Sequence, residues 1–262
     1  MFLDDLKSGR IIFGLNNSYP ASGIIESMCF GWDFVWIDGQ HGQHDYRSIF
    51  QCVQASRAVG IYSVIRVPCQ DAAYLGLYSD TMPSAIMVPM VNCAGDAHKA
   101  VECLKFPPLG KRSYGGRTPI DIKGREYYKS TDIALIAQIE SLEALNNLES
   151  IASVNGIDVL FFGADDMKVY MGLPINTPLL KSSELLGSAE KIAGISRKMG
   201  KYCGIIATSR EERKVAIELG YQVIVAGGDS SFIRELSGRK LEDIKEEGFY
   251  IGRGVTSRNA CP

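Results

Sequence analysis

The chain is poor in the residues that build zinc cages, disulfide frameworks and membrane spans. It has three His and two Trp in 262 residues, and none of its seven Cys forms a CxxC pair. An odd number of Cys is typical of a protein in a reducing compartment. The N-terminal segment is charged, whereas a signal peptide would need an apolar core. No apolar run approaches the about 20 residues that cross a bilayer, and no block of Lys or Arg suggests nucleic-acid binding. These absences favour a cytoplasmic protein with neither membrane nor nucleic-acid partners.

What the chain has instead is a large apolar fraction arranged in short runs. Hydrophobic residues make up 46% of the chain and charged residues 22%, with a net charge of −2, as in an ordinary soluble enzyme. The runs are continuous and rich in β-branched residues, which is typical of strands buried on both faces of a parallel sheet. We predict strands at Ile11–Leu15, Phe34–Asp38, Ser63–Val67, Ala85–Val91, Ala134–Glu140, Val159–Gly163, Cys203–Ala207 and Gln222–Ala226.

Segments with helical spacing separate these strands. Leu142–Ile151 carries apolar residues at three-residue intervals, which predicts one helix. Ala189–Met199 predicts another, which ends before a glycine. The longest stretch without a regular pattern is about Phe106 to Thr131, and a connection of that length is usually functional or flexible.

This alternation favours an α/β fold. Eight strands interspersed with helices predict a (β/α)₈ TIM barrel, with residues 1–262 as a single domain and a C-terminal tail from about residue 240. An open doubly wound sheet is the competing fold. No GxGxxG motif follows the first predicted strand, which weakens a dinucleotide-binding interpretation.

Polar and charged side chains come at the ends of the predicted strands. Asp38 ends the second strand, and the stretch WIDGQHG puts His41 directly after it. Arg66 lies near the end of the third strand, Glu140 ends the fifth and Asp166 follows the sixth. The carboxyl ends of barrel strands meet at one mouth, where catalysis occurs. Ions beside buried strands are retained when they pair with each other, with a metal or with a substrate.

These residue types suggest a hard divalent cation. Mg²⁺ is usually held by one or two carboxylates together with water and substrate oxygens, whereas a zinc cage would need more His or Cys. Each residue also has a structural alternative: Glu140 and Asp166 as helix caps or ion-pair partners, Arg66 in an ion pair, and His41 as a loop histidine. His44 is expected to be a solvated loop residue.

Four blocks of the sequence resemble the HpcH/HpaI aldolase family of metal-dependent class II aldolases that act on 2-keto acids. The blocks are FVWIDGQHG, VIRVP, IMVPMVNCAGDAHKAVECLKFPPLGKRSYG and AQIESLEALNNLESIASVNGIDVLFFGADDMKVYMGLP. The resemblance implies a (β/α)₈ barrel that is usually homo-oligomeric, often a hexamer built from dimers. It also implies a divalent ion, Mg²⁺, Mn²⁺ or Co²⁺, bound by Glu140 and Asp166.

The same resemblance implies roles in binding pyruvate. Arg66 would contact the carbonyl or enolate oxygen, and Gln138 would line the pyruvate site. The backbone N–H groups of Asp165 and Asp166 would hold the pyruvate carboxylate, and Asp38 would support the site.

The resemblance further implies a His41–Asp80 dyad that handles the proton of the substrate hydroxyl. The implied reaction is the reversible cleavage of a 4-hydroxy-2-keto acid, similar to 4-hydroxy-2-oxoheptanedioate, to pyruvate and an aldehyde. Two alternatives stay open: a citrate-lyase-β-like lyase that acts on acyl-CoA thioesters, and a non-catalytic paralogue that binds a keto acid.

The chain departs from the family pattern around these residues. SDTMPS, which contains Asp80, replaces a smaller glycine-containing segment, and GADDMK replaces GPxDLS, so that Asp165 adds a carboxylate beside the proposed ligand. Asp165 could raise metal affinity or point to solvent. Arg117 or Arg125 could bind a distal carboxylate of the substrate, but the sequence does not choose between them.

Overall fold

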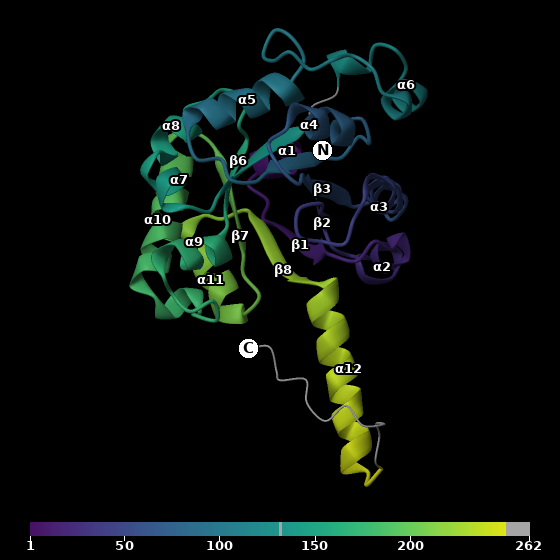
Figure 1. Ribbon diagram of the computed structural model, residues 1–262, viewed down its shortest axis with the longest axis vertical. Helices are drawn as coiled ribbons and strands as arrows, with labels where there is room; N and C mark the ends of the chain where they lie inside the picture. The colour runs from purple at the N-terminus through teal and green to yellow at the C-terminus, as the bar shows by residue number, and fades with distance from the viewer. Residues whose placement is uncertain (131–132, 250–262) are drawn as a thin grey trace.

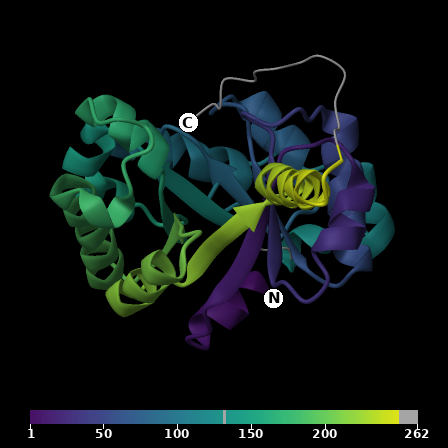
Figure 2. The same ribbon diagram turned by 90° about the horizontal axis from the view of Figure 1, so that it is seen from below.

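Eight parallel strands close into a barrel, surrounded by helices (Figures 1 and 2). The computed structural model describes residues 1–130 and 133–249. The strands pair in chain order and β8 pairs with β1. This arrangement confirms the predicted (β/α)₈ barrel and excludes the open doubly wound sheet. The strands are β1 (Ile12–Asn17), β2 (Phe34–Asp38), β3 (Tyr62–Arg66), β4 (Ala85–Val88), β5 (Ala134–Ile139), β6 (Val159–Phe162), β7 (Tyr202–Ile206) and β8 (Val223–Gly228).

Most of the helices follow a strand and cover the outside of the barrel. They are α1 (Phe2–Lys7), α2 (Ser22–Met28), α3 (Tyr46–Ala58), α4 (Ala72–Ser79), α5 (Ala94–Leu104), α6 (Arg117–Lys123), α7 (Leu142–Asn146), α8 (Leu148–Ala152), α9 (Ala164–Met171), α10 (Ser183–Lys198), α11 (Arg210–Leu219) and α12 (Asp229–Glu246), with 3₁₀ turns η1 (Tyr127–Lys129) and η2 (Leu179–Lys181). Within the described ranges, no helix is long and apolar enough to cross a membrane.

The strands are largely apolar because both of their faces are buried, and polar residues such as Asp38, Arg66 and Gln138 come near their carboxyl ends. Phe34 and Trp36 of β2 point into the barrel and belong to its inner core, whereas Val35 and Ile37 belong to the core between strands and helices. Inside the barrel, the rings of Trp36 and Phe161 meet edge to face with centroids 5.3 Å apart. A Cβ at Gly204 would lie 2.5 Å from the Phe161 ring, so the large ring requires glycine on the neighbouring strand.

Two local predictions were wrong. The expected helix Leu142–Ile151 is divided into α7 and α8 at Asn147, whose side-chain amide donates a hydrogen bond to the carbonyl of Asn92 (2.9 Å). A side chain committed to a backbone partner in this way competes with helix continuation. The segment from Phe106 onward is not irregular throughout, because α6 and η1 lie within it; its predicted end, Thr131, is outside the described residues.

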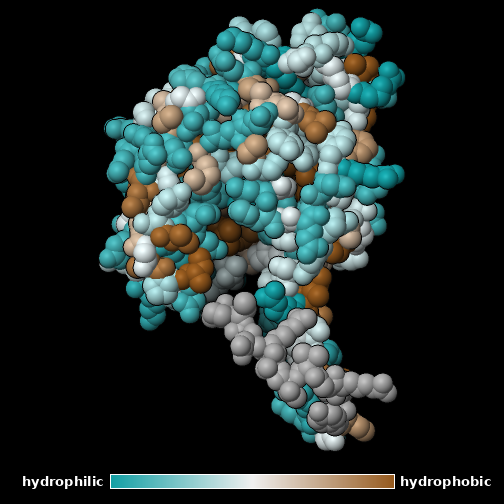
Figure 3. Space-filling view, in the orientation of Figure 1, coloured by the Kyte–Doolittle hydropathy of each residue, from teal (hydrophilic) through white to brown (hydrophobic). Residues whose placement is uncertain are grey.

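The last helix, α12, leaves the barrel instead of packing along it (Figure 1). It continues past residue 240, where the sequence suggested that a tail begins, to Glu246. Among its residues only Asp229 is buried, whereas Phe232, Ile233 and Leu236 are exposed. Figure 3 shows the helix standing clear of the barrel body. An apolar helix face that the other described residues leave exposed is typical of an interaction surface.

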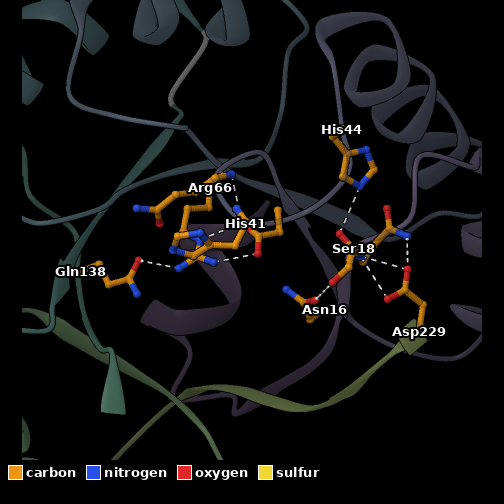
Figure 4. Close-up of polar contacts among 10 residues, drawn as sticks. Asn16, Ser18, His41, His44, Arg66, Gln138 and Asp229 are labelled. Carbon is orange, nitrogen blue, oxygen red and sulfur yellow. Dashed lines mark hydrogen bonds and ion pairs between the residues drawn. The ribbon is translucent and has the colours of Figure 1, made fainter. Parts of the chain in front are cut away.

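The first residue of α12 connects the carboxyl end of β8 to the carboxyl end of β1. The fully buried Asp229 carboxylate accepts hydrogen bonds from the Asn17 side chain (2.8 Å) and from the N–H groups of Ser18 (2.9 Å) and Tyr19 (2.9 Å) (Figure 4). His44 joins the same region, since its ring bonds to the carbonyl of Asn17 (3.2 Å) and to the hydroxyl of Ser48 (3.3 Å). His44 is therefore a half-buried structural residue between β1 and α3, not the solvated residue that we expected.

We predict that His44 makes folding stability pH-dependent. Burial lowers its pKa from the usual 6.5, although the Asn17 carbonyl and Asp229 oppose that shift. Below about pH 6.5 the unfolded chain therefore binds more protons than the folded chain. This contribution is fully present above that pH and is lost as the pH falls through the folded pKa. Urea unfolding of His44→Gln between about pH 7.5 and pH 5 should show a shallower decline than wild type. His98→Gln, on an exposed position of α5, is the control; an unchanged slope in His44→Gln would refute the prediction.

Candidate active site

A cavity of about 600 Å³ opens at the carboxyl ends of the barrel strands. Five of the residues predicted from the sequence line it: His41, Arg66, Gln138, Asp165 and Asp166. They come from the ends of β2, β3, β5 and β6 and from the start of α9. Parallel closure of the sheet brings these strand ends together, as the barrel prediction required.

A buried ion pair lies beside this cavity. Arg66 and Asp38 are register partners on β3 and β2. The guanidinium donates two hydrogen bonds to the carboxylate, Nε to Oδ1 (2.8 Å) and Nη2 to Oδ2 (2.7 Å). Burial alone would raise the pKa of Asp38, but Arg66 and the N–H groups of His41 and Gln40 lower it overall. Asp38 therefore holds Arg66 and the loop that carries His41. The resemblance places Asp38 among the substrate-binding residues, but its side chain does not line the cavity.

The free edge of the Arg66 guanidinium faces the cavity. Its Nη1 donates to the side-chain amide oxygen Oε1 of Gln138 (3.5 Å), and its Cζ lies 4.7 Å from the centroid of the Trp36 ring. Figure 4 shows His41, Arg66 and Gln138 gathered at one place. Because Asp38 and Trp36 fix the guanidinium on two sides, Arg66 offers a preorganised positive charge to an anionic oxygen.

Two carboxylates lie close together under the cavity. Glu140, directly after β5, is 1% exposed, and its Oε1 accepts the Met90 N–H (2.7 Å). Its Oε2 is buried and has no hydrogen-bond partner among the residues that the structure describes. Burial raises the pKa of Glu140 to about 7, with Asp166 adding to the rise while the Met90 N–H and Arg66 oppose it. A buried carboxylate oxygen with no donor, next to a second carboxylate, fits a cation.

The donor set agrees with a hard ion. The structure, over the ranges it describes, has no group of three or more His, Cys, Asp or Glu that could form a metal cage. Two carboxylates are enough for Mg²⁺, which keeps water and substrate oxygens as its other ligands. Glu140 and Asp166 therefore fit the ion that the family resemblance implies.

Gly163 allows the two carboxylates to approach each other. It connects β6 to α9, and a Cβ there would lie 2.8 Å from Oε2 of Glu140 and 2.9 Å from Nε2 of Gln138. Any side chain would therefore collide with Glu140 and Gln138, so glycine is required for this close approach. The sequence signal for this role, a glycine between an apolar strand and an acidic helix start, was present but not recognised.

The first turn of α9 carries both acidic residues toward the cavity. Asp166 is half-buried, whereas the Asp165 side chain is 72% exposed and pairs with Lys168 (2.9 Å). Lys168 Nζ also donates to the carbonyl of Ile175 (3.2 Å), which fixes the segment after α9. Lys168 also lines the cavity. It was not identified from the sequence, although it stands three residues after Asp165, at a spacing where helical side chains meet.

One predicted residue lies at the other end of the barrel. Asp80 caps the carboxyl end of α4, which leads to the amino end of β4, and it pairs with the buried Arg112 (2.9 Å). His41 follows the carboxyl end of β2. A single chain therefore does not bring Asp80 and His41 together.

The two arginines considered for a distal carboxylate are also outside the cavity. Arg117 is on α6 and forms an ion pair with Asp121. Arg125 lines a separate cavity with Phe106 and Tyr128. Neither residue lines the cavity at the carboxyl ends of the strands.

The chain is similar to known proteins over most of its length. Residues 16–235 match the HpcH/HpaI aldolase/citrate lyase family. A hydroxypyruvate/pyruvate aldolase of Pseudomonas aeruginosa is 31% identical over 251 residues, which cover 91% of each chain. A 4-hydroxy-2-oxo-heptane-1,7-dioate aldolase of Salmonella typhimurium is 30% identical over 241 residues, 88% of this chain and 89% of the relative.

The fold is shared with a solved structure. A crystal structure of an HpcH/HpaI aldolase/citrate lyase family protein from Burkholderia cenocepacia matches with a TM-score of 0.85 at 24% identity, over 93% of this chain and 98% of that one. Since the family match extends from residue 16, in β1, to residue 235, in α12, and so covers most of the chain, the protein belongs to the HpcH/HpaI aldolase/citrate lyase family and is a carbon–carbon lyase.

Proposed function

We propose that the protein is a divalent-metal-dependent aldolase that reversibly cleaves a 4-hydroxy-2-keto acid to pyruvate and an aldehyde. The observation that carries the proposal is the partnerless buried oxygen of Glu140 beside Asp166, below a cavity that also contains Arg66. The names of the relatives from Pseudomonas aeruginosa and Salmonella typhimurium support the same reaction class.

The reaction requires stabilisation of an enolate. The bond between C3 and C4 of the substrate breaks, its electron pair passes to C3 to form the pyruvate enolate, and the C4 hydroxyl loses its proton to leave an aldehyde. Protonation of C3 then gives pyruvate. Mg²⁺, Mn²⁺ or Co²⁺ held by Glu140 and Asp166 would act as a Lewis acid at the enolate oxygen.

The chain's own groups supply the remaining functions. Arg66, held by Asp38, puts a fixed positive charge next to the developing oxyanion, and Gln138 orients the keto acid. The N–H groups of Asp165 and Asp166 are in the first turn of α9, where unpaired amide hydrogens favour a carboxylate. His41, which lines the cavity, accepts the hydroxyl proton, a general-base role that imidazole side chains commonly fill.

The first test is metal-dependent exchange of the pyruvate methyl protons in deuterated water, followed by NMR. Wild type should exchange with Mg²⁺, Mn²⁺ or Co²⁺ and stop with EDTA. Glu140→Gln keeps an acceptor for the Met90 N–H but removes the charge, so exchange should fall by at least about 100-fold. Glu143→Gln, on an exposed position of α7, is the control. Exchange that persists in EDTA, or in Glu140→Gln, would exclude this mechanism.

A second test separates proton transfer from binding. His41→Ala should slow cleavage by roughly 10²–10⁴-fold, as expected of a general base, while calorimetry should show that pyruvate still binds. If Asp80 orients His41, Asp80→Asn should likewise slow cleavage while pyruvate still binds. Because Asp80 and His41 lie at opposite ends of one barrel, this role requires a second copy of the chain. Mixing Asp80→Asn and Glu140→Gln subunits should then restore part of the activity. Loss of pyruvate binding in His41→Ala would contradict the assigned role.

We also propose that the protein is a homo-oligomer, either a dimer or a hexamer built from dimers. The exposed apolar residues Phe232, Ile233 and Leu236 on α12 support this assembly, since such a face is stabilised when a second copy covers it. Light scattering should give a mass of two or six times the 28.7 kDa of one chain. Leu236→Glu should shift the protein toward monomer, whereas Lys240→Glu on the same helix should not. A monomeric wild type at micromolar concentration would refute the assembly.

A further inference from the structure

The outer part of the cavity has its own set of polar residues. We call it the acceptor end, defined by Asn16 on β1, Asn176 and Thr177 after α9, Thr208 after β7 and Glu212 on α11. Glu140, Gln138 and Arg66 are nearly fully buried at the base of the site, whereas Asn176 is exposed and Glu212 is half-buried. Under the proposed function, pyruvate occupies the base, so the aldehyde half of the substrate extends to the acceptor end.

The Lys and Arg side chains that line this cavity, among the described residues, are already paired with carboxylates of the chain. Arg66 forms its bidentate pair with Asp38. Lys168 pairs with Asp165 (2.9 Å), and its ammonium also donates to the Ile175 carbonyl. Arg117 and Arg125, the other candidates for binding a carboxylate, do not line the cavity. A second carboxylate on the substrate would therefore meet no uncommitted Lys or Arg among the lining residues that the structure describes.

Glu212 instead provides a negative charge at the acceptor end. Its Oε2 accepts the Ser209 N–H at 3.2 Å, as part of the capping box that begins α11. No Lys or Arg within residues 1–130 and 133–249 forms an ion pair with this carboxylate. It can accept a hydrogen bond from a substrate hydroxyl, and it repels a nearby carboxylate, which is how binding sites exclude a competing substrate.

We propose, resting on the aldolase function above, that the acceptor end takes an uncharged, hydroxyl-bearing aldehyde and that Glu212 disfavours aldehydes with a terminal carboxylate. Asn16, Asn176, Thr177 and Thr208 supply amide and hydroxyl partners for the hydroxyl groups of such an aldehyde. The Salmonella typhimurium relative is named for a dioate, a substrate with a second carboxylate. The two proteins would therefore differ in the charge of the aldehyde that they use.

The test compares two aldehydes in one protein sample. Pyruvate is supplied with glyceraldehyde, which is neutral and hydroxylated, or with succinic semialdehyde, which ends in a carboxylate. The ratio of the two kcat/KM values is independent of the fraction of active protein. Wild type should prefer glyceraldehyde. Glu212→Gln should shift the ratio toward succinic semialdehyde by roughly tenfold, since one repulsive charge is removed.

The structure offers a matched control. Gln serves in a capping box as Glu does, so Glu212→Gln changes charge without removing the start of α11. Glu211→Gln removes the same charge from the neighbouring residue, which is exposed and lines a different cavity. This control should keep the wild-type ratio. A ratio that Glu212→Gln does not move, or that Glu211→Gln moves equally, overturns the inference.

Failure of this inference is distinguishable from failure of the proposed function. If wild type does not exchange the pyruvate methyl protons with any divalent metal, the aldolase function falls and this inference falls with it. If exchange occurs but wild type prefers succinic semialdehyde, only the inference is overturned, and a cation from a second copy must reach the acceptor end.

Discussion

The ion pair between Arg66 and Asp38 is the interaction on which the rest of the site depends. Two buried charges are stable only when geometry and further hydrogen bonds compensate their desolvation. Here the pairing is bidentate, and the Asp38 carboxylate also accepts the N–H groups of Gln40 and His41. One carboxylate thereby fixes both the guanidinium that faces the cavity and the loop that carries His41. Replacing either partner would leave a charge buried and unpaired, so neither position tolerates a neutral residue without loss of the whole arrangement.

The second constraint is the close packing of β5 against the start of α9. Glu140 leaves one oxygen without a donor because Gly163 brings the helix, with Asp166, directly against it. This arrangement is unfavourable for the protein alone, since a desolvated carboxylate beside another resists ionisation. Such local cost is retained where a bound group removes it, which is why strained polar groups gather at functional sites.

The sequence was sufficient for the fold and for the strand-end residues because both follow from periodicity. Short, continuous apolar runs are typical of strands that are buried on both faces of a parallel sheet. In a barrel of such strands, the polar residue that ends a run, such as Arg66 or Glu140, lies at the mouth. The split at Asn147 was not predictable, because it depends on the carbonyl of Asn92, 55 residues away. Asp80 was assigned to the site by resemblance, but chain order alone puts the end of α4 at the opposite end of the barrel. Lys168 and Glu212 escaped notice because their helices, not the strands, bring them to the cavity.

The charge balance of the cavity separates its two ends. In the proposed reaction, Arg66 and the divalent ion that Glu140 and Asp166 would hold favour an enolate at the base of the cavity, where negative charge is created. At the acceptor end, the Lys168 ammonium is already committed to Asp165 and to the Ile175 carbonyl, so it stabilises the wall of the cavity more than it attracts a ligand. Glu212 remains as the charge that a substrate meets there. A site organised in this way concentrates its positive potential where the bond breaks and leaves recognition of the other half of the substrate to hydrogen bonding, which depends on shape and hydroxyl placement more than on charge.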